Sequence, residues 1–294
     1  MRYSFSGHES FHCKPLWLKK GFDHLNEGHT FLDDNAVVEL GVGKNMVASI
    51  RFWMKAFALT DSDKLTMLSH LIFSNNGFDP FCEDIGTLWL LHYQLVTTHV
   101  ASIYDLTFTE FQRERREFDK EQLLGFIHRK CNVLEQKNVY NENTVKKDIS
   151  VMLQTYVPPT NLKQLEHFGA MFIGLSLIIP IDDGRYRFAE TDSTSLPNEI
   201  MLFAIIDIKG NDKTVSFDKI QYLSLLFCMP VGIILEKLMA IAAKYPDYID
   251  YNDNSGIRNL FFKHELDKYE VLNQYYSRLS LIPQHYYKIF FLST

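Results

Sequence analysis

The sequence predicts an α+β protein that is mainly helical, with a winged helix-turn-helix N-terminal domain and a helical, winged-helix-like C-terminal domain. Three observations support this fold class. Within residues 35–58, a short apolar segment, a glycine-containing turn and a longer amphipathic segment follow one another. Further along, helical patterns are twice followed by a hairpin pattern. Finally, 46% of the 294 residues are hydrophobic, which is enough to bury the cores of two ordinary domains.

The first 30 residues combine a polar turn with a short helix. Pro15 suits the first position of a helix, which we expect to end at Gly21. Before it, the polar turn SGHES carries His8 and Glu9, and His12 follows closely. A loop of this composition either carries chemistry or is held against a core by its flanking aromatic residues.

Residues 35–58 are typical of two helices joined by a tight turn. The first helix stops at Gly41, Gly43 loosens the turn, and the second helix begins near Lys44. Apolar residues of the second helix recur at steps of three and four, which predicts one buried stripe. This stripe contains Met46, Val47, Ile50, Trp53, Met54 and Phe57.

The opposite side of the second helix carries hydrogen-bond donors, and we expect it to read DNA. Small Ala48 would let the helix approach a groove closely, and no acidic residue lies between Glu39 and Asp61. The alternative is a pair of packed helices with a solvated basic face, because winged helices also bind proteins. The predicted DNA-binding residues are Lys44, Asn45, Ser49, Arg51 and Lys55.

The segments that follow predict the return of the winged helix and then mostly helices. Residues 60–75 contain a turn and an apolar segment, and a loop then delivers Glu83 and Asp84 to the start of an apolar helix, TLWLLHYQLV. Negative charge there stabilises the free amides of the helix by roughly 0.3 to 1 kcal/mol per charge. Amphipathic patterns predict further helices over residues 109–137 and 144–156.

A change of composition over residues 138–143 suggests a boundary between an N-terminal domain, 1–138, and a C-terminal domain, 143–294. The C-terminal part contains LSLIIPI, a DDG turn and RYRFAE, which predict a hairpin. Later, two helices separated at Met229-Pro230 precede a second hairpin with Asn-Ser-Gly at its tip. The outward face of this last helix holds Glu236, Lys237 and Lys244, a mixture that favours packing or partner binding over DNA.

Charge and cysteine content limit the class of protein. The net charge of −6 means that any DNA binding must be local. The four cysteines form no C-x-x-C pair, which indicates reduced thiols and no structural zinc site. Because the sequence shows neither a signal peptide nor an apolar run of membrane-spanning length, we expect a cytoplasmic protein with no membrane partner.

Three N-terminal blocks resemble a bacterial family of long-undefined function, whose members are encoded beside the genes for DNA phosphorothioation. The blocks are FSGHESF at 5–11, ELGVGKNMVASIRFW at 39–53 and FDPFCEDIGTLWLLHY at 78–93, and weaker likeness extends to SGIRNL. The resemblance implies binding to double-stranded DNA and nicking of one strand, which opens the backbone for sulfur insertion in a bacterial defence system. It also implies a cysteine desulfurase, a sulfur-transfer enzyme and an ATPase as partners.

The chemistry of nicking suggests where an endonuclease site would lie. Cutting a phosphodiester needs a nucleophile, stabilisation of charge on phosphorus and an acid, often supplied by carboxylates that hold Mg²⁺. We hypothesise that Asp79, Glu83 and Asp84 hold Mg²⁺ or another divalent metal, and that Asp84 also serves catalysis. His8 would be the base, and Glu9 a second ligand or orienting group. Each of these residues also suits a structural role in a turn, at a helix end or in a core.

The sequence leaves two other functions open. The protein could be a non-catalytic DNA-binding adaptor or transcriptional regulator that recruits the sulfur-transfer machinery. It could also be a protein-interaction scaffold whose winged helices bind partners. Metal-dependent cutting separates the nickase from both alternatives, and salt-sensitive DNA affinity separates the adaptor from the scaffold.

Overall fold

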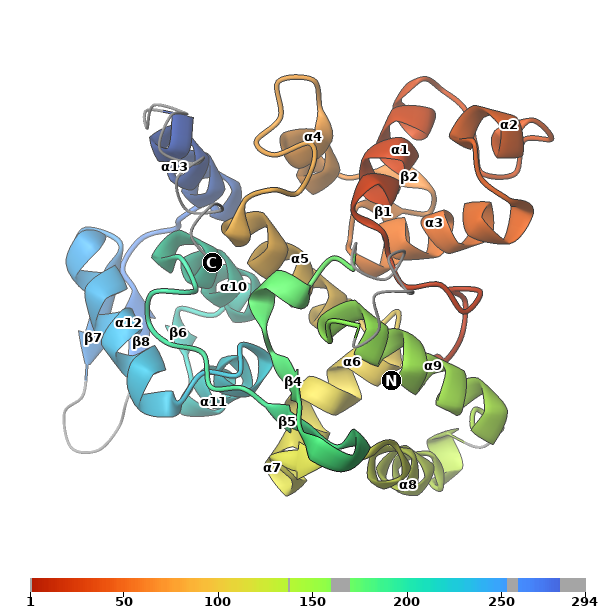
Figure 1. The fold of residues 1–294 in the computed structure, drawn as a ribbon. Helices are drawn as coiled ribbons and strands as arrows, with labels where there is room; N and C mark the ends of the chain where they lie inside the picture. The colour runs from red at the N-terminus through yellow and green to blue at the C-terminus, as the bar shows by residue number, and fades with distance from the viewer. Residues whose placement is uncertain (1, 137, 160–169, 253–258, 281–294) are drawn as a thin grey trace. The chain divides into compact units, whose positions relative to one another are not determined.

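The computed structural model describes residues 2–136, 138–159, 170–252 and 259–280. The protein is mainly helical with small antiparallel sheets, which confirms the predicted α+β class (Figure 1). Its contacts divide the chain into two units, residues 1–192 with 222–230, and residues 193–221 with 231–294. Residues 138–143, where the composition changes, lie inside the first unit.

The N-terminal part of the first unit contains the helix pair and a short hairpin. The first of the two helices ends at Gly41, whose φ of 63° gives the left-handed conformation that glycine adopts without strain. The two residues of the hairpin turn, Ser62 and Asp63, also have positive φ, of 50° and 60°. The elements are α1 (Pro15–Asn26), α2 (Ala36–Leu40), α3 (Lys44–Ala56), β1 (Thr60–Asp61) and β2 (Lys64–Leu65).

The expected end of α1 at Gly21 is wrong, because the helix continues to Asn26. Gly21 lies where α1 packs on α3. A Cβ atom at this position would lie 3.0 Å from side-chain atoms of both Ile50 and Met54. The glycine therefore serves close packing of two helices and not helix termination.

The rest of the first unit surrounds an aromatic core. Helix α5 is buried along most of its length, as its apolar sequence predicts. Strands β3, β5 and β4 form an antiparallel sheet in that order. The elements are α4 (Met67–Phe73), α5 (Ile85–Thr97), α6 (Ser102–Asp105), the π-helix η1 (Leu106–Phe111), α7 (Gln112–Glu114), β3 (Glu117–Phe118), α8 (Lys120–Cys131), η2 (Leu134–Gln136), α9 (Glu142–Tyr156), η4 (Ile173–Leu175), β4 (Ile178–Pro180), η5 (Asp182–Gly184) and β5 (Tyr186–Phe188).

The prediction of a single helix over residues 109–137 is wrong. The chain leaves helical conformation at β3, where Phe118 is fully buried and pairs with Tyr186 of β5. Helix α8 then starts afresh at a capping box, in which Asp119 accepts the Gln122 N–H and the Gln122 side chain accepts the Asp119 N–H. Pairing with a strand distant in sequence thus overrides the local helical pattern.

The chain after residue 192 contains two helices in succession and then a hairpin, in the predicted order. Strands β6, β8 and β7 form its antiparallel sheet. The division between the units passes through α11. The elements are α10 (Asn198–Lys209), β6 (Thr214–Val215), α11 (Phe217–Leu226), α12 (Val231–Lys244), β7 (Ile249–Asn252), β8 (Asn259–Phe262) and α13 (Lys268–Ser280). The Asn-Ser-Gly tip lies outside the described residues.

The outward face predicted for α12 is partly wrong. Lys237 is only 5% exposed, and its ammonium donates to the Ser193 carbonyl at 2.8 Å. Lys244 pairs with the buried carboxylate of Glu199, which also accepts from Arg278. These contacts tie α12 to its own unit.

Within the part of the chain that the structure describes, no single helix has both the length and the apolarity to cross a bilayer. The pair α11 and α12 meets these two criteria only when taken together, with a bend of 112° between the helices.

Candidate nucleic-acid interface and a buried histidine pair

Helix α3 has two distinct faces. Its inner face matches the predicted stripe, because Val47, Ile50, Trp53 and Met54 are buried, while Met46 is half-buried. The outer face exposes the predicted DNA-binding side chains Lys44, Asn45 and Lys55, with Ala48 among them and Arg51 half-exposed. The helix therefore presents donors to solvent on one side only.

Ser49 is the exception among the predicted DNA-binding residues. It is fully buried, and its hydroxyl donates to the His8 carbonyl at 3.0 Å. On the helix it lies three residues after Met46 and four before Trp53, so it shares their inward face. Ser49 therefore holds the N-terminal loop against α3, and the expectation that it contacts DNA is wrong.

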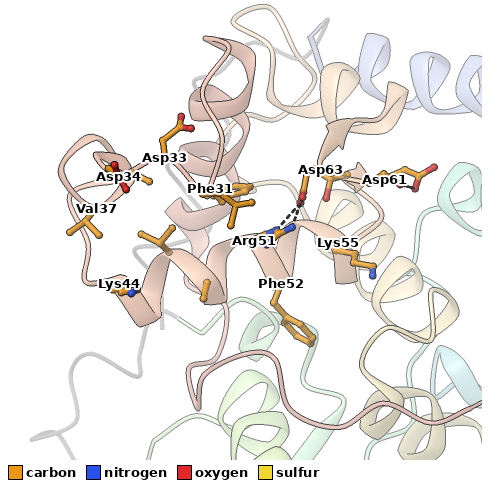
Figure 2. Close-up of a pocket in the computed structure, with 16 residues that line it drawn as sticks. Phe31, Asp33, Asp34, Val37, Lys44, Arg51, Phe52, Lys55, Asp61 and Asp63 are labelled. Atoms are coloured by element: carbon orange, nitrogen blue, oxygen red, sulfur yellow. Dashed lines mark hydrogen bonds and ion pairs between the residues drawn. The ribbon is translucent and has the colours of Figure 1, made fainter.

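A cleft of about 750 Å³ runs along the outer face of α3. Figure 2 shows Asp33 and Asp34 near the Val37 and Lys44 end of the cleft, and Asp61 and Asp63 near the Lys55 end. The absence of acidic residues between Glu39 and Asp61 in sequence therefore does not give a purely basic surface, because folding brings four carboxylates beside the helix. They are Asp33, Asp34, Asp61 and Asp63.

Arg51 is paired across this cleft. Its Nε donates to Asp63 Oδ1 at 2.9 Å and its Nη2 donates to Asp63 Oδ2 at 2.5 Å, a two-bond arrangement drawn as dashed lines in Figure 2. The hydrogen bond to Arg51 lowers the pKa of Asp63 and raises that of Arg51. Both side chains are about two-fifths exposed, at 41% and 42%. The guanidinium group is thus already engaged with the hairpin.

The N-terminal loop holds His8 in a constrained position. Ser6, Gly7, Glu9 and Ser10 have φ values of 74°, 101°, 49° and 65°, so four of five neighbouring residues are in conformations that L-residues rarely adopt. Strain of this kind is frequent at functional sites, where the surrounding structure maintains it. His8 itself is only 3% exposed.

Both ring nitrogens of His8 have partners. Nε2 lies 3.0 Å from Asp148 Oδ1, and Nδ1 accepts the Ser10 N–H at 3.1 Å. Since Nδ1 accepts, Nε2 carries the proton and donates to the carboxylate. Asp148 also accepts the Ser6 N–H, at 2.9 and 3.2 Å from its two oxygens. The carboxylate thus fixes both the tautomer of His8 and the backbone of its loop.

The inner face of α3 supports the same loop. The His8 ring stacks on Trp53, with centroids 6.1 Å apart, and the Trp53 indole N–H donates to the Phe11 carbonyl at 3.2 Å. A Cβ atom at Gly7 would lie 2.6 Å from the Phe52 ring, so any side chain there would have to displace Phe52. The predicted reader helix and the FSGHESF loop therefore form one packed assembly.

Asp148 is not among the site residues predicted from the sequence. A usable signal exists, because Val145, Asp148, Ile149 and Met152 are spaced as one face of α9, and the other three are buried apolar residues. A carboxylate on an apolar face requires a buried partner. His8 is 140 residues away in sequence, so the pattern predicts that a partner exists without identifying it.

A smaller cleft of about 210 Å³ lies beside this pair. The predicted site residues His8 and Glu9, which are neighbours in sequence, both line this cleft. Glu9 is exposed and His8 is buried. Asp84 is not among its lining residues. The lining is completed by Ser6, Gly7, Ser10, Thr144, Lys147 and Asp148.

The acidic loop before α5 does not have the arrangement expected of a metal site. The oxygens of Asp79 accept the N–H groups of Glu83 and Asp84 at 3.0 and 2.9 Å. Asp84 caps α5, accepting the N–H groups of Gly86 and Thr87 at 2.8 and 3.3 Å. Among the described residues, no three His, Cys, Asp or Glu side chains are grouped so as to hold a metal ion. The carboxylates of Asp79 and Asp84 thus stabilise their own loop and helix, and together with the exposed Glu83 they do not fit the expected Mg²⁺ ligand set.

Comparison with known proteins identifies relatives along nearly the whole chain. Residues 5–276 match the family described as "Protein of unknown function (DUF4007)". Two solved structures, described as "SspB crystal structure" and "Magnesium ion-bound SspB crystal structure", are each 26% identical, with a TM-score of 0.82 over 96% of this chain and 90% of the other. No curated protein sequence matches. The chain therefore belongs to the DUF4007 family and is SspB-like in sequence and fold.

Proposed function

We propose that this protein is the DNA-binding component of a bacterial DNA phosphorothioation system and that it nicks one strand of the DNA. In this proposal α1 to α3 and the β1–β2 hairpin act as a winged helix-turn-helix, with α3 as the reader. The observation that carries it is the division of α3 into a packed inner face and an outer face of donors. The likeness to SspB and the resemblance of the sequence blocks to phosphorothioation proteins support the same assignment.

The chemistry of the outer face suits duplex DNA. Lys44 and Lys55 are exposed cations near the two ends of the helix, where phosphates flank a helix lying in the major groove. Asn45 and Arg51 carry the amide and guanidinium groups that bond adenine and guanine edges. Since the net charge is −6, binding depends on these local contacts and not on the whole surface.

We propose the cleft of His8 and Glu9 as the nicking site. Glu9 supplies an exposed carboxylate that reaches solvent, suited to accept a proton from the attacking water. Asp148 orients His8, which becomes a proton acceptor only when Nδ1 releases the Ser10 N–H. The magnesium-bound SspB structure motivates a test of divalent cations. No step is assigned to a metal, because among the described residues Asp79, Glu83 and Asp84 do not form a ligand group.

Relaxation of supercoiled plasmid by the purified protein tests the proposal, with Mg²⁺, Mn²⁺ or EDTA present. We expect the wild-type protein to convert plasmid to open circles, and Glu9→Gln and Asp148→Asn to reduce the rate at least tenfold. Glu27→Gln is the matched control, because Glu27 is an exposed carboxylate at the end of α1. Full activity of Glu9→Gln would remove this cleft from the mechanism.

The same assay separates the nickase from the second candidate, a non-catalytic adaptor or transcriptional regulator. The observation that favours the adaptor is the engagement of Asp79 and Asp84 with backbone amides. Plasmid binding without nicking under all metal conditions would support the adaptor. The cysteine desulfurase, sulfur-transfer enzyme and ATPase would then supply the chemistry.

A further inference from the structure

The ion pair between Arg51 and Asp63 lies at the centre of the proposed DNA-binding face. Asp63 belongs to the tight hairpin turn, and Figure 2 shows its carboxylate directed at the Arg51 guanidinium on α3. Both oxygens are used, so the fork of Arg51 is filled by a planar, two-point acceptor. A guanine edge, with O6 and N7, offers the same two-point geometry.

Pairing with Asp63 changes how Arg51 meets DNA. A phosphate at this position would approach a guanidinium whose charge is already balanced, next to a carboxylate that repels it. Exposed ion pairs are weak, so a better-matched acceptor can displace the carboxylate. A guanine edge has two neutral acceptor atoms, and it therefore suffers less repulsion from Asp63 than a phosphate does.

The other walls of the cleft also carry negative charge. Asp33, Asp34 and Asp61 line it together with Asp63, against the three cations Lys44, Arg51 and Lys55. The cleft therefore has no excess of positive charge to attract DNA regardless of sequence. Affinity at this surface must come from matched contacts.

We propose that Asp63 is a specificity-determining residue of the reader helix. It holds Arg51 ready for a guanine edge and suppresses phosphate contacts by the same guanidinium, so that duplexes without guanine at this position bind poorly. This inference rests on the proposed DNA-binding function and specifies the base class that Arg51 reads.

The first measurement is the affinity for a fluorescein-labelled duplex of random sequence at several salt concentrations. Asp63→Asn should bind this duplex several-fold more tightly than wild type. Its slope of log affinity against log salt should be steeper by about one, because one phosphate contact is gained. Asp34→Asn is the matched control. Asp34 lines the same cleft and its substitution removes the same charge, whereas the ion-pair partner of Arg51 is Asp63. Asp34→Asn should change the affinity much less.

The second measurement is selection from a randomised duplex library, followed by sequencing of the bound fraction. Wild-type protein should enrich guanine at one position, and Asp63→Asn should lose most of that preference. In an Arg51→Ala background, Asp63→Asn should have no further effect on either measurement, because the two residues act as a pair.

The outcomes distinguish this inference from the function on which it rests. If Lys44→Ala weakens binding while Asp63→Asn behaves like Asp34→Asn, the role of Asp63 is overturned and the reader helix stands. The same holds if the Asp63→Asn effect persists without Arg51. If Lys44→Ala and Arg51→Ala leave binding unchanged, the proposed reader helix fails, and this inference fails with it.

Discussion

His92 is a buried histidine whose neutral form is fully satisfied. Its Nε2 donates to the Leu226 carbonyl at 2.8 Å, and the Tyr156 hydroxyl donates to its Nδ1 at 2.7 Å. Phe108 lies edge-on against it, with ring centroids 4.9 Å apart. Burial lowers the pKa of His92 to about 4, because the charged imidazolium would lose its water. A proton on Nδ1 would also remove the acceptor of the Tyr156 hydroxyl.

This environment predicts that stability falls in mild acid. The unfolded chain protonates His92 near pH 6.5 and the folded chain only near pH 4, so the unfolded state binds more protons between these values. The free energy of unfolding should therefore fall by about 3 kcal/mol as pH drops from 6.5 to 4. Urea denaturation at several pH values measures it.

A matched pair of variants isolates the contribution of His92. His92→Gln should lower stability at neutral pH but flatten this part of the pH profile. His70→Gln, at an exposed position, should keep the wild-type slope. If His92→Gln retains that slope, other groups cause the pH dependence.

At the scale of elements, α3 joins the two proposed sites. Its outer face lines the large cleft, and its inner face holds the loop of His8 through Ser49 and Trp53. Gly7 is the point where this packing leaves no room for a side chain.

Gly7→Ala should therefore destabilise the protein more than an equivalent substitution elsewhere. Gly28 is the control, because both glycines have positive φ, of 101° and 88°, but a Cβ atom at Gly28 meets nothing within 4 Å. We expect Gly28→Ala to cost about 1 kcal/mol from backbone strain, and Gly7→Ala about 2 kcal/mol or more, since Phe52 must also move. Equal losses in urea denaturation would show that the loop is not packed as described.

Local patterns predicted the elements that depend on neighbours in sequence. Helix α3 and its buried stripe were predictable because a period of 3.6 residues and the glycines of the turn are local signals. The roles of Gly21 and Ser49 were not, because each depends on a segment brought close by folding. The helix break at β3 likewise follows from pairing with β5, about 70 residues further along the chain.

In the candidate site, too, local patterns predicted some residues, while the roles of others depend on contacts formed on folding. The composition of the FSGHESF loop predicted a candidate site, and in the structure His8 and Glu9 of this loop line one cleft. Asp148 comes from a distant part of the chain, so no local pattern connects it to the loop of His8. The acidic walls beside α3 come from the loop before α2 and from the β1–β2 hairpin, and it is the folding of these turns that places them against the helix. Asp79 and Asp84 were plausible metal ligands by residue type, but hydrogen bonds to backbone amides of their own loop and of the first turn of α5 already engage them.

At the scale of the whole molecule, an acidic protein is proposed to bind an acidic polymer. The net charge of −6 opposes DNA at long range, and the four cleft carboxylates oppose it nearby. Binding must then rest on a few cations of one helix. This arrangement predicts a modest dependence on salt, far below that of a protein coated with basic residues.

The salt dependence of duplex binding tests this central claim most directly. Affinity for a random-sequence duplex would be measured from low to physiological salt for wild type, for the double variant Lys44→Ala with Lys55→Ala, and for Lys120→Ala on α8. If both lysines contact phosphates, the double variant should bind more weakly, and its slope should be shallower by about two. Lys120→Ala should match wild type. Identical slopes in all three proteins would contradict the assignment of α3 as the DNA-binding helix.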